Sequence, residues 1–372
     1  MKGVLRKRIA GGGDVAFLVA VVVLTAIGAV FIYSASNYSA RATYGDEYFF
    51  VKKQVIGIIL GIAAMIFTAF YDYERLKKFT VVISVVSFVL LGLVFVPGLG
   101  VENYGARRWI GFGAFTVQPS EIAKFALILF SASYFSAYKE RVTTFKGVLP
   151  VFVFGGATCV FVILEPNMSI TVCIAALMLT LVFSVGLKIK ALLFVVLPAL
   201  FAGVALILVE PYRLSRLAAF LNPWSNPKGE GYQLLQSLYA LGSGGWFGVG
   251  LFNSRQKYAF LPFAESDFIL SVIGEEIGFI GLLLFFALLF FIVIRGLRAA
   301  KRAADVFGYA LAVGITMIFG IQVLINALVV TGSIPPTGLP LPLVSSGNTS
   351  IIIFMAEMGI VYNVSRSKAI TF

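Results

Sequence analysis

Ten runs of about 20 apolar residues, separated by polar segments, are the feature of this sequence that most limits its fold. A helix needs roughly 20 consecutive apolar residues to cross the hydrocarbon core of a bilayer. Of the 372 residues, 60% are hydrophobic and only 12% are charged, about half the charged share of a soluble domain. We therefore predict an all-α integral membrane protein, with residues 1–372 in a single polytopic domain. The expected spans are 14–34, 51–71, 79–96, 119–137, 147–164, 168–186, 190–209, 268–294, 306–329 and 343–364.

The basic residues are unevenly divided among the segments that connect these spans. With residues 1–13 placed in the cytoplasm, the inner segments hold most of the 29 lysines and arginines, as the positive-inside rule requires. We therefore predict that both termini lie inside. Within the longest outer segment, Gln233 to Leu241 has the apolar spacing of a helix that lies along the membrane surface. A loop of this length is uncommon unless it is functional or disordered, and its many aromatic residues favour a structured loop. The outer segments to which we assign function are 97–118, 210–267 and 330–342.

Composition excludes several kinds of chemistry. The chain has no histidine, so it contains no His general base, no Ser-His-Asp triad and no His-ligated metal. Its two cysteines, Cys159 and Cys173, lie in apolar runs, where packing explains them. The net charge of +12 is typical of the cytoplasmic loops of a membrane protein, and we expect no nucleic-acid partner. The glycine-rich stretch 242–250 lacks the endings of phosphate-binding loops and predicts a tight turn.

Two groups of polar residues near the fourth predicted span need an explanation. Glu121 and Lys124 are three residues apart, so they share a helix face and can pair. The pair is either a structural ion pair that closes the helix bundle or part of a cavity that opens outward. Arg107 and Arg108 precede the span in an outer segment. They either contact lipid headgroups or bind phosphate, which suits the geometry of the arginine fork.

Asp267 stands where the eighth predicted span begins. A carboxylate at this point can cap the helix by accepting N–H bonds at its positive end. The alternative is a general base at the membrane boundary, with Lys257 and the two arginines nearby to hold an anionic leaving group. Further along the span, Glu275 and Glu276 point about 100° apart, so we expect that they cannot both face one site. GxxxG spacing, which permits close helix packing, occurs at 57–61 and 274–278.

Taken together, several short strings resemble the SEDS family, the shape, elongation, division and sporulation proteins. The strings follow one another in the family's order from about residue 14 to residue 366. Each is weak alone, but their order and topology make the resemblance specific. Gln256-Lys257 is more similar to the FtsW/SpoVE branch than to the RodA branch. The other strings are Gly105-Ala106-Arg107-Arg108-Trp109, Gln118-Pro119-Ser120-Glu121, Gly231-Tyr232-Gln233, Gly242-Ser243-Gly244-Gly245, Leu261-Pro262, Asp267-Phe268, Gly274-Glu275-Glu276 and Leu341-Pro342-Leu343.

The resemblance implies a ten-helix peptidoglycan glycosyltransferase in the bacterial plasma membrane. Such an enzyme polymerises lipid II outside the membrane: the 4-hydroxyl of an acceptor sugar attacks C1 of a donor sugar and displaces undecaprenyl diphosphate. By resemblance, Asp267 matches the family's essential aspartate and would act as the base. Arg107, Arg108 and Lys257 would offset the charge of the departing diphosphate. The other residues that we assign to substrate binding on this basis are Glu121, Lys124, Gln256, Glu265, Ser345 and Ser346.

The resemblance also implies partners. They are lipid II, a class B penicillin-binding protein that crosslinks the new glycan, and other proteins of the cell-wall synthesis complex. No resident cofactor is expected, and a divalent cation that bridges the diphosphate is left open. Two other functions remain as alternatives: a transporter that flips lipid II, and a scaffold that would not require Asp267. The sequence has no convincing internal repeat, and its polar segments gather on the outer side, so the polymerase is favoured.

The chain departs from the family pattern in its outer loops. Phe263 stands where the family often has Glu, and Glu265 offers a carboxylate two positions later. Asn167 replaces the Asp of a common Glu-Pro-Asp string, and Thr337 stands where some members carry Lys. The stretch 345–350 also differs from the usual Ser-Tyr-Gly-Gly-Ser-Ser. We expect these changes to alter the lining of the cavity and to leave the fold intact.

Overall fold

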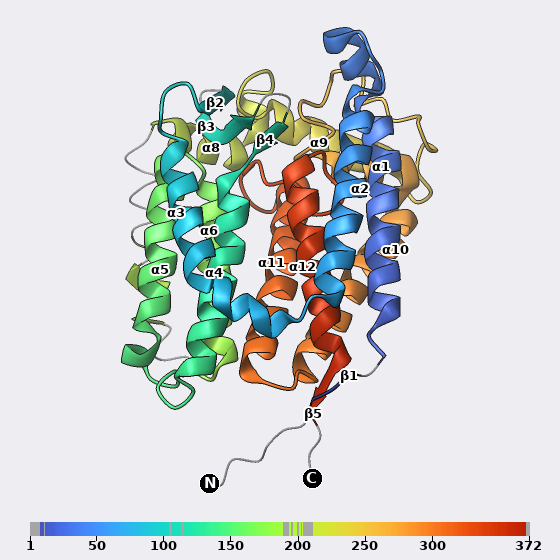
Figure 1. Ribbon diagram of the computed structural model, residues 1–372. Helices are drawn as coiled ribbons and strands as arrows, with labels where there is room; N and C mark the ends of the chain where they lie inside the picture. Colours follow the sequence, from blue (N-terminus) through green and yellow to red (C-terminus); the bar gives the residue numbers. More distant parts are fainter. Residues whose placement is uncertain are drawn as a thin grey trace.

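Long helices that stand side by side make up most of the computed structural model (Figure 1). At one end of this bundle, strand β1 (Arg8–Ala10) pairs antiparallel with strand β5 (Ser367–Ala369). The structure describes residues 8–10, 12–103, 106–112, 115–188 and 211–369, with isolated residues between 193 and 203. The helices of the bundle are α1 (Val15–Tyr44), α2 (Phe49–Phe70), α3 (Thr80–Leu93) with the preceding 3-10 helix η1 (Tyr73–Phe79), α4 (Pro119–Ala137), α5 (Phe145–Leu164), α6 (Met168–Ser184), α10 (Ile269–Lys301), α11 (Val306–Val330) and α12 (Asn348–Arg366).

The prediction of a mostly helical protein with several membrane spans is confirmed. Within the described part of the chain, six helices are long and apolar enough to cross a membrane: α1, α2, η1 with α3, α5, α10 and α11. Helices α4 and α12 have 19 residues each, but they carry charged side chains that are buried inside the bundle. The seventh predicted span, 190–209, lies largely outside the described residues. The count of ten spans and the N-in, C-in orientation therefore stay predictions.

Small residues set how closely the helices approach one another. A Cβ added at Gly61 of α2 would lie 2.6 Å from the sulfur of Met355 in α12, and one at Gly57 would lie 3.4 Å from Cα of Asn348. The GxxxG spacing at 57–61 therefore marks a close helix contact, as predicted. The two cysteines are unpaired thiols packed among the helices, which agrees with the interpretation from sequence.

Helix α1 extends past the predicted end of its span at residue 34 and continues to Tyr44. Its 30 residues correspond to about 45 Å, against roughly 30 Å for the hydrocarbon core of a bilayer. The predicted end of the span at residue 34 is therefore not the end of the helix, because the apolar run stops before the helix does. The helix stops at Gly45, whose φ of 71° is a left-handed conformation that glycine adopts readily.

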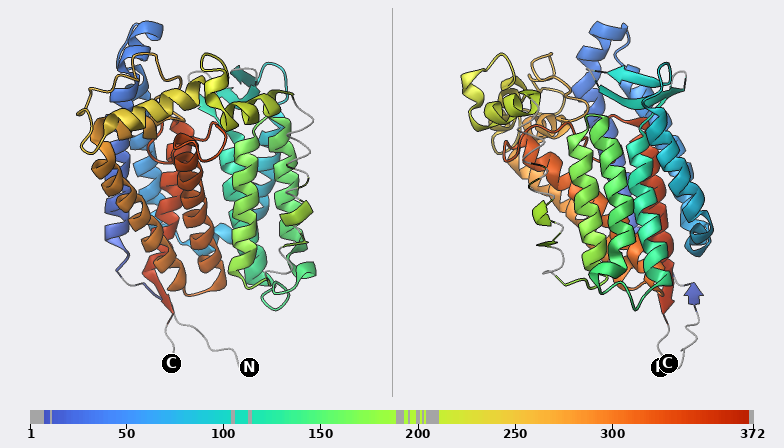
Figure 2. Two further views of the ribbon diagram at one scale, coloured as in Figure 1. Left: turned by 180° about the vertical axis from the view of Figure 1, so that it is seen from behind. Right: turned by 90° about the vertical axis from the view of Figure 1, so that its left-hand side faces the viewer.

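The end of the bundle opposite β1 and β5 carries the predicted outer segments. There, α8 (Pro211–Leu221) and α9 (Tyr232–Gly244) run across the bundle rather than along it (Figure 2). The helix predicted at Gln233 to Leu241 is therefore confirmed as α9. Segment 97–118 forms an antiparallel sheet in the order β2-β3-β4, which the sequence pattern does not predict because its strands are short. The strands are β2 (Gly100–Asn103), β3 (Ala106–Phe112) and β4 (Phe115–Val117).

Candidate active site

Asp267 lies at the end of the long segment that leads into α10, and its side chain is half-buried. The residue that caps α10 is Phe268, which makes no side-chain capping bond, so the capping role considered for Asp267 is excluded. The backbone carbonyl of Asp267 accepts a 2.9 Å hydrogen bond from Nδ2 of Asn326 in α11, which also donates to the carbonyl of Leu339 at 2.7 Å. A Cβ at Gly338 would lie 3.2 Å from Oδ2 of Asp267. The carboxylate of Asp267 therefore lies directly against Gly338 in the loop 331–347.

Burial and the neighbouring charges together set the pKa of the Asp267 carboxyl. Burial raises the pKa of its carboxyl to about 6, and the nearby carboxylate of Glu265 adds to this effect. Arg108 and Arg216 act in the opposite direction, because their positive charge favours the ionised carboxylate. At neutral pH the carboxylate is therefore mostly ionised and still more basic than an ordinary Asp.

Two arginines reach this site from different elements. Arg108 lies on β3 and donates from Nε to the carbonyl of Glu165 at 3.4 Å, and from Nη2 to the carbonyl of Pro166. Arg216 lies on α8 and donates from Nη1 to the carbonyl of Pro336 at 3.3 Å. Arg107, the neighbour of Arg108 on the strand, is exposed. Arg108 and Arg216 are thus both hydrogen-bonded to the backbone of neighbouring turns.

The loop 331–347, between α11 and α12, holds the segment before α10 in place. Ser345 donates from Oγ to the carbonyl of Ser266 at 2.6 Å and accepts from the N–H of Leu341 at 2.8 Å. The N–H of Ser346 donates to the carbonyl of Glu265 at 2.9 Å. Burial raises the pKa of the Glu265 carboxyl. The two serines assigned to substrate binding therefore fix the backbone of the two residues that precede Asp267.

Glu121 and Lys124 form the predicted ion pair inside the bundle. Nζ of Lys124 lies 2.7 Å from Oε1 of Glu121, and each side chain is only 2% exposed. The ammonium also lies over the ring of Phe354 in α12, at 5.3 Å from its centroid, and Glu357 is close enough to interact with both charges. The pair therefore joins α4 to α12. Its role in substrate binding stays a prediction.

Lys257 and Gln256 lie in a second polar cluster. Nζ of Lys257 donates to the carbonyl of Phe252 and lies 3.9 Å from Oε1 of Glu276. The side chain of Lys257 is buried, and burial lowers the pKa of its ammonium. The side-chain carbonyl of Gln256 is buried without a hydrogen-bond partner in the described structure. The predicted contact of Lys257 with the leaving group stays a prediction.

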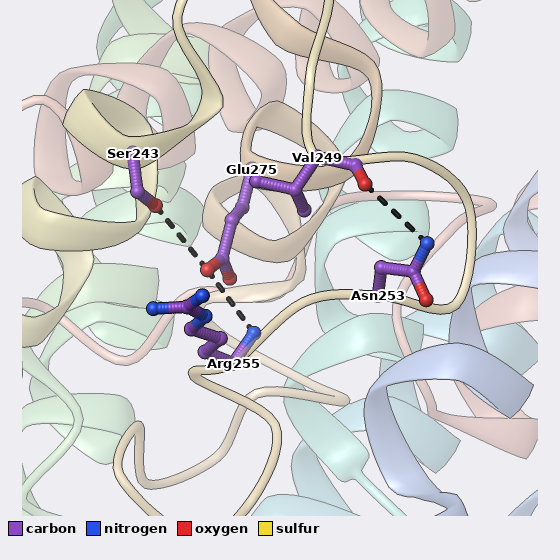
Figure 3. Close-up of a pocket in the computed structure, with 5 residues that line it drawn as sticks. All are labelled: Ser243, Val249, Asn253, Arg255 and Glu275. Atoms are coloured by element: carbon purple, nitrogen blue, oxygen red, sulfur yellow. Dashed lines mark hydrogen bonds between the residues drawn. The ribbon is translucent and has the colours of Figure 1, made fainter.

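The two glutamates of α10 both face this second cluster, which corrects the expectation that they diverge. The hydroxyl of Ser254 donates to Glu275, and its N–H donates to Oε1 of Glu276 at 3.3 Å. The reason is that both long side chains reach the same loop from successive positions on the helix. Glu275 also accepts from Oγ of Ser243 at 3.2 Å and from the N–H of Arg255 at 3.1 Å, beside a cavity of about 380 Å³ (Figure 3).

Helix α10 is interrupted at Gly278, where φ is 68° and ψ is −171°. The interruption leaves backbone groups without helical partners. The predicted turn 242–250, whose first three residues end α9, supplies these partners. The N–H groups of Val249 and Gly250 donate to the carbonyls of Glu275 and Glu276 at 2.9 and 3.1 Å. In return, the N–H groups of Phe279 and Ile280 donate to the carbonyls of Gly245 and Trp246 at 2.9 and 3.1 Å.

Three residues that lie near Asp267 or Arg108 are not selected as site residues by the sequence analysis. Arg216 stands among other basic residues in a long outer segment, so nothing in the sequence distinguishes it. Asn326 is one of two amide residues, with Gln322, in an apolar span, and that signal could have identified it. Glu165 ends an apolar span and offers the same signal. Within the described residues, no three Cys, Asp or Glu side chains gather in the manner of a metal site.

Comparisons with known proteins agree with this architecture. Residues 15–370 match the family described as FtsW/RodA/SpoVE, cell cycle protein. The chain is 39% identical to stage V sporulation protein E of Bacillus subtilis over 358 residues, which cover 95% of this chain and 97% of the relative. It is also 39% identical over 353 residues to the protein named probable peptidoglycan glycosyltransferase FtsW of Trichlorobacter lovleyi, covering 95% and 93%.

Solved structures share the fold. A chain from the work on "structural coordination of polymerization and crosslinking by a peptidoglycan synthase complex" superposes with a TM-score of 0.78 at 27% identity, covering 95% of this chain and 98% of the other. The crystal structure of the rod shape determining protein RodA of Thermus thermophilus gives a TM-score of 0.71 at 25% identity, covering 95% and 97%. The chain belongs to the FtsW/RodA/SpoVE family and is a multi-pass membrane protein of the SEDS type.

Proposed function

We propose that this chain is a peptidoglycan glycosyltransferase that polymerises lipid II at the outer face of the bacterial plasma membrane. The observation that carries the proposal is the half-buried carboxylate of Asp267, placed near Arg108 and Arg216 under loops at one end of the bundle. A base beside two cations suits a reaction that removes a proton from a hydroxyl and releases a diphosphate. The names of relatives such as the FtsW protein of Trichlorobacter lovleyi support the same activity.

The proposed step is a single displacement at C1 of the donor sugar. The 4-hydroxyl of the acceptor sugar forms the new C1–O bond, and its proton passes to the carboxylate of Asp267. The bond from C1 to the diphosphate oxygen breaks, and undecaprenyl diphosphate leaves with the electron pair. Attack opposite the leaving group inverts the configuration at C1. A pKa of about 6 suits Asp267 to this role, because a general base works best when its pKa lies near the operating pH.

The two arginines would stabilise the negative charge that develops on the diphosphate. Guanidinium forks bind phosphate oxygens in pairs, and both forks are already anchored to neighbouring turns through backbone carbonyls. By the family resemblance, the buried pair of Glu121 and Lys124 would form the floor of the substrate cavity. A divalent cation, if the reaction uses one, would arrive with the diphosphate of the substrate.

The partner that we propose is a class B penicillin-binding protein, which would crosslink the strands that this chain makes, together with other proteins of the cell-wall synthesis complex. The support is the fold shared with a chain of a peptidoglycan synthase complex, whose description names both polymerization and crosslinking. Coupling the two activities places each new strand beside the enzyme that links it to the wall.

A lipid II transporter is the second candidate, and the interruption of α10 is the observation that favours it. Interrupted helices are common in transporters, where they bind cargo near the middle of the membrane. In this chain, however, the turn 242–250 satisfies the backbone groups at Gly278, and the arginines lie at the outer end of the bundle beside Asp267. These features favour chemistry at the outer face over passage through the membrane.

The orientation that this function requires is N-in and C-in with ten spans. It can be tested with cysteines introduced at exposed positions into a Cys159→Ser protein, because Cys159 is partly exposed and Cys173 is buried. Ser225→Cys, at the end of η2 (Pro223–Ser225), should react with a membrane-impermeant maleimide added to intact cells. Lys301→Cys, at the C-terminal end of α10, should react only after lysis. The reverse pattern would overturn the proposed orientation.

The activity itself is tested by incubating the purified protein, with its penicillin-binding partner, with lipid II and separating the products by size. We expect glycan polymers from the complex and none from the partner alone. Transport of lipid II across vesicle membranes without any polymer would instead establish the second candidate.

A further inference from the structure

Glu165 is a buried acidic residue that the proposed mechanism does not use. It ends α5 as the residue after Leu164, and its N–H donates to the carbonyl of Phe161 at 3.2 Å. The side chain is 0% exposed, and neither Oε1 nor Oε2 has a hydrogen-bond partner within the described structure. An ionised carboxylate in such a place would lose its hydration without any compensating hydrogen bond, which is expensive.

The turn that begins at Glu165 is part of the candidate active site. Arg108 donates to the backbone carbonyl of Glu165, so the guanidinium and the carboxyl group belong to one corner of the site. At the start of α6, directly after this turn, Oγ of Ser169 donates to the carbonyl of Thr337. The residue after Thr337 is Gly338, which lies against the carboxylate of Asp267. Two sets of contacts therefore connect Glu165 to Asp267. One runs through Arg108, and the other runs from Ser169 through the loop 331–347.

The field of Arg108 acts on both carboxyl groups. It lowers the pKa of Glu165 and that of Asp267, but burial of Glu165 is the larger effect and raises its pKa to about 8. Asn167 and Ser169, the polar residues that follow in the turn, carry no charge. Beyond Arg108, the charged groups of the site are Glu265 and Arg216, which act on Asp267.

We propose that Glu165 is a positioning residue whose uncharged carboxyl keeps the net charge of the Arg108 corner at +1, so that this corner attracts the anionic diphosphate of the substrate. This inference rests on the proposed function, because it assumes a substrate that carries a diphosphate. Were Glu165 ionised, its charge would cancel that of Arg108 and the corner would hold the diphosphate less well. Ionisation would also draw the guanidinium toward α5 and away from the substrate.

The first test is the pH dependence of KM for lipid II. Because Glu165 loses its proton as the pH rises through about 8, KM of the wild-type protein should rise about tenfold between pH 7 and pH 9, with a smaller change in kcat. Glu165→Gln keeps the shape of the side chain and cannot ionise, so its KM should be low and flat over the same range. Glu230→Gln, the same change at an exposed position, should retain the wild-type rise.

A KM of the wild-type protein that stays flat would overturn the proposal, as would a Glu165→Gln protein whose KM rises with pH like that of the wild type. The wild-type measurement stands alone if the variant does not fold. The second test does not need activity: subtracting the infrared spectrum of Glu165→Gln from that of the wild-type protein should leave a protonated-carboxyl band at pH 7 that is lost by pH 9. Without that band Glu165 is ionised and the inference fails. With the band but without any glycan polymer, it is the proposed function that fails.

Discussion

Replacing Gly278 by alanine perturbs the interruption of α10 at its most constrained point. The backbone of Gly278 has φ 68° and ψ −171°, a region that is accessible essentially to glycine alone. A Cβ there would lie 2.2 Å from the nitrogen of Gly248 and 2.7 Å from the carbonyl carbon of Phe247, both of which are backbone atoms that cannot move independently. The substitution must therefore push the turn 242–250 away from α10.

The cost of Gly278→Ala follows from these contacts. Backbone strain contributes about 1–3 kcal/mol. Losing two or three of the four backbone hydrogen bonds between the turn and α10 adds about 1 kcal/mol for each bond. The total is about 3–6 kcal/mol, which for a chain of 372 residues lowers the melting temperature by about 4–8 °C.

The assay is thermal unfolding of the purified protein in one detergent, followed by intrinsic fluorescence. The matched control is Gly156→Ala, in the middle of α5, where a Cβ would meet no atom within 4 Å. Because alanine favours helix over glycine by about 1 kcal/mol, the control should keep or slightly raise the melting temperature. Equal melting temperatures for the two variants would refute the inference that the turn and α10 share a backbone contact at Gly278.

Two further predictions concern buried polar contacts. Lys124→Met leaves the carboxylate of Glu121 buried without its ion pair and should lower the free energy of unfolding by about 3–5 kcal/mol. Adding Glu121→Gln removes the unpaired charge and should recover part of this loss. Equal losses in the single and double variants, measured by thermal unfolding, would show that the pair does not stabilise the bundle. Asn326→Ala removes the amide that binds the carbonyls of Asp267 and Leu339. Because the base is then misplaced, the rate of lipid II polymerisation should fall by about 10²-fold, with the rate of Asn326→Gln in between. A wild-type rate in Asn326→Ala would show that these hydrogen bonds do not position Asp267.

Hydropathy predicts most of the helices because crossing a membrane demands long apolar runs, and this demand is visible in the sequence. It does not give the end of α1, because the helix continues ten residues past its apolar run and stops only at Gly45. It also gives no sign of β2, β3 and β4, since strands of three to seven residues are too short to show an alternating pattern.

The candidate site is predicted in part. Asp267 and Arg108 are identified from the sequence, and the structure brings them within electrostatic reach. Local geometry alone suggests that Asp267 caps a helix and that Glu275 and Glu276 diverge. Both expectations fail because tertiary contacts decide where a side chain points: α10 begins after Phe268, and Ser254 lies within reach of both glutamates.

Other members of the site depend on contacts between distant parts of the chain. Arg216 approaches Asp267 because α8 crosses the end of the bundle. Glu165 joins the site because the strand β3 brings Arg108 to the end of α5. Neither contact has a local signature in the sequence. Closeness in sequence can also mislead. Lys257 is only ten residues from Asp267, yet its ammonium lies beside Glu276 in the second polar cluster.

The most direct measurement is the rate at which Asp267→Asn polymerises lipid II at pH 7 in the presence of the penicillin-binding partner. Asparagine has nearly the same shape and cannot accept the proton, so the rate should fall by about 10²–10⁴-fold while the melting temperature is maintained. Asp46→Asn, the same change in the exposed α1–α2 connection, should retain the wild-type rate. Polymerisation by Asp267→Asn at a rate close to that of Asp46→Asn would mean that another group accepts the proton of the sugar hydroxyl.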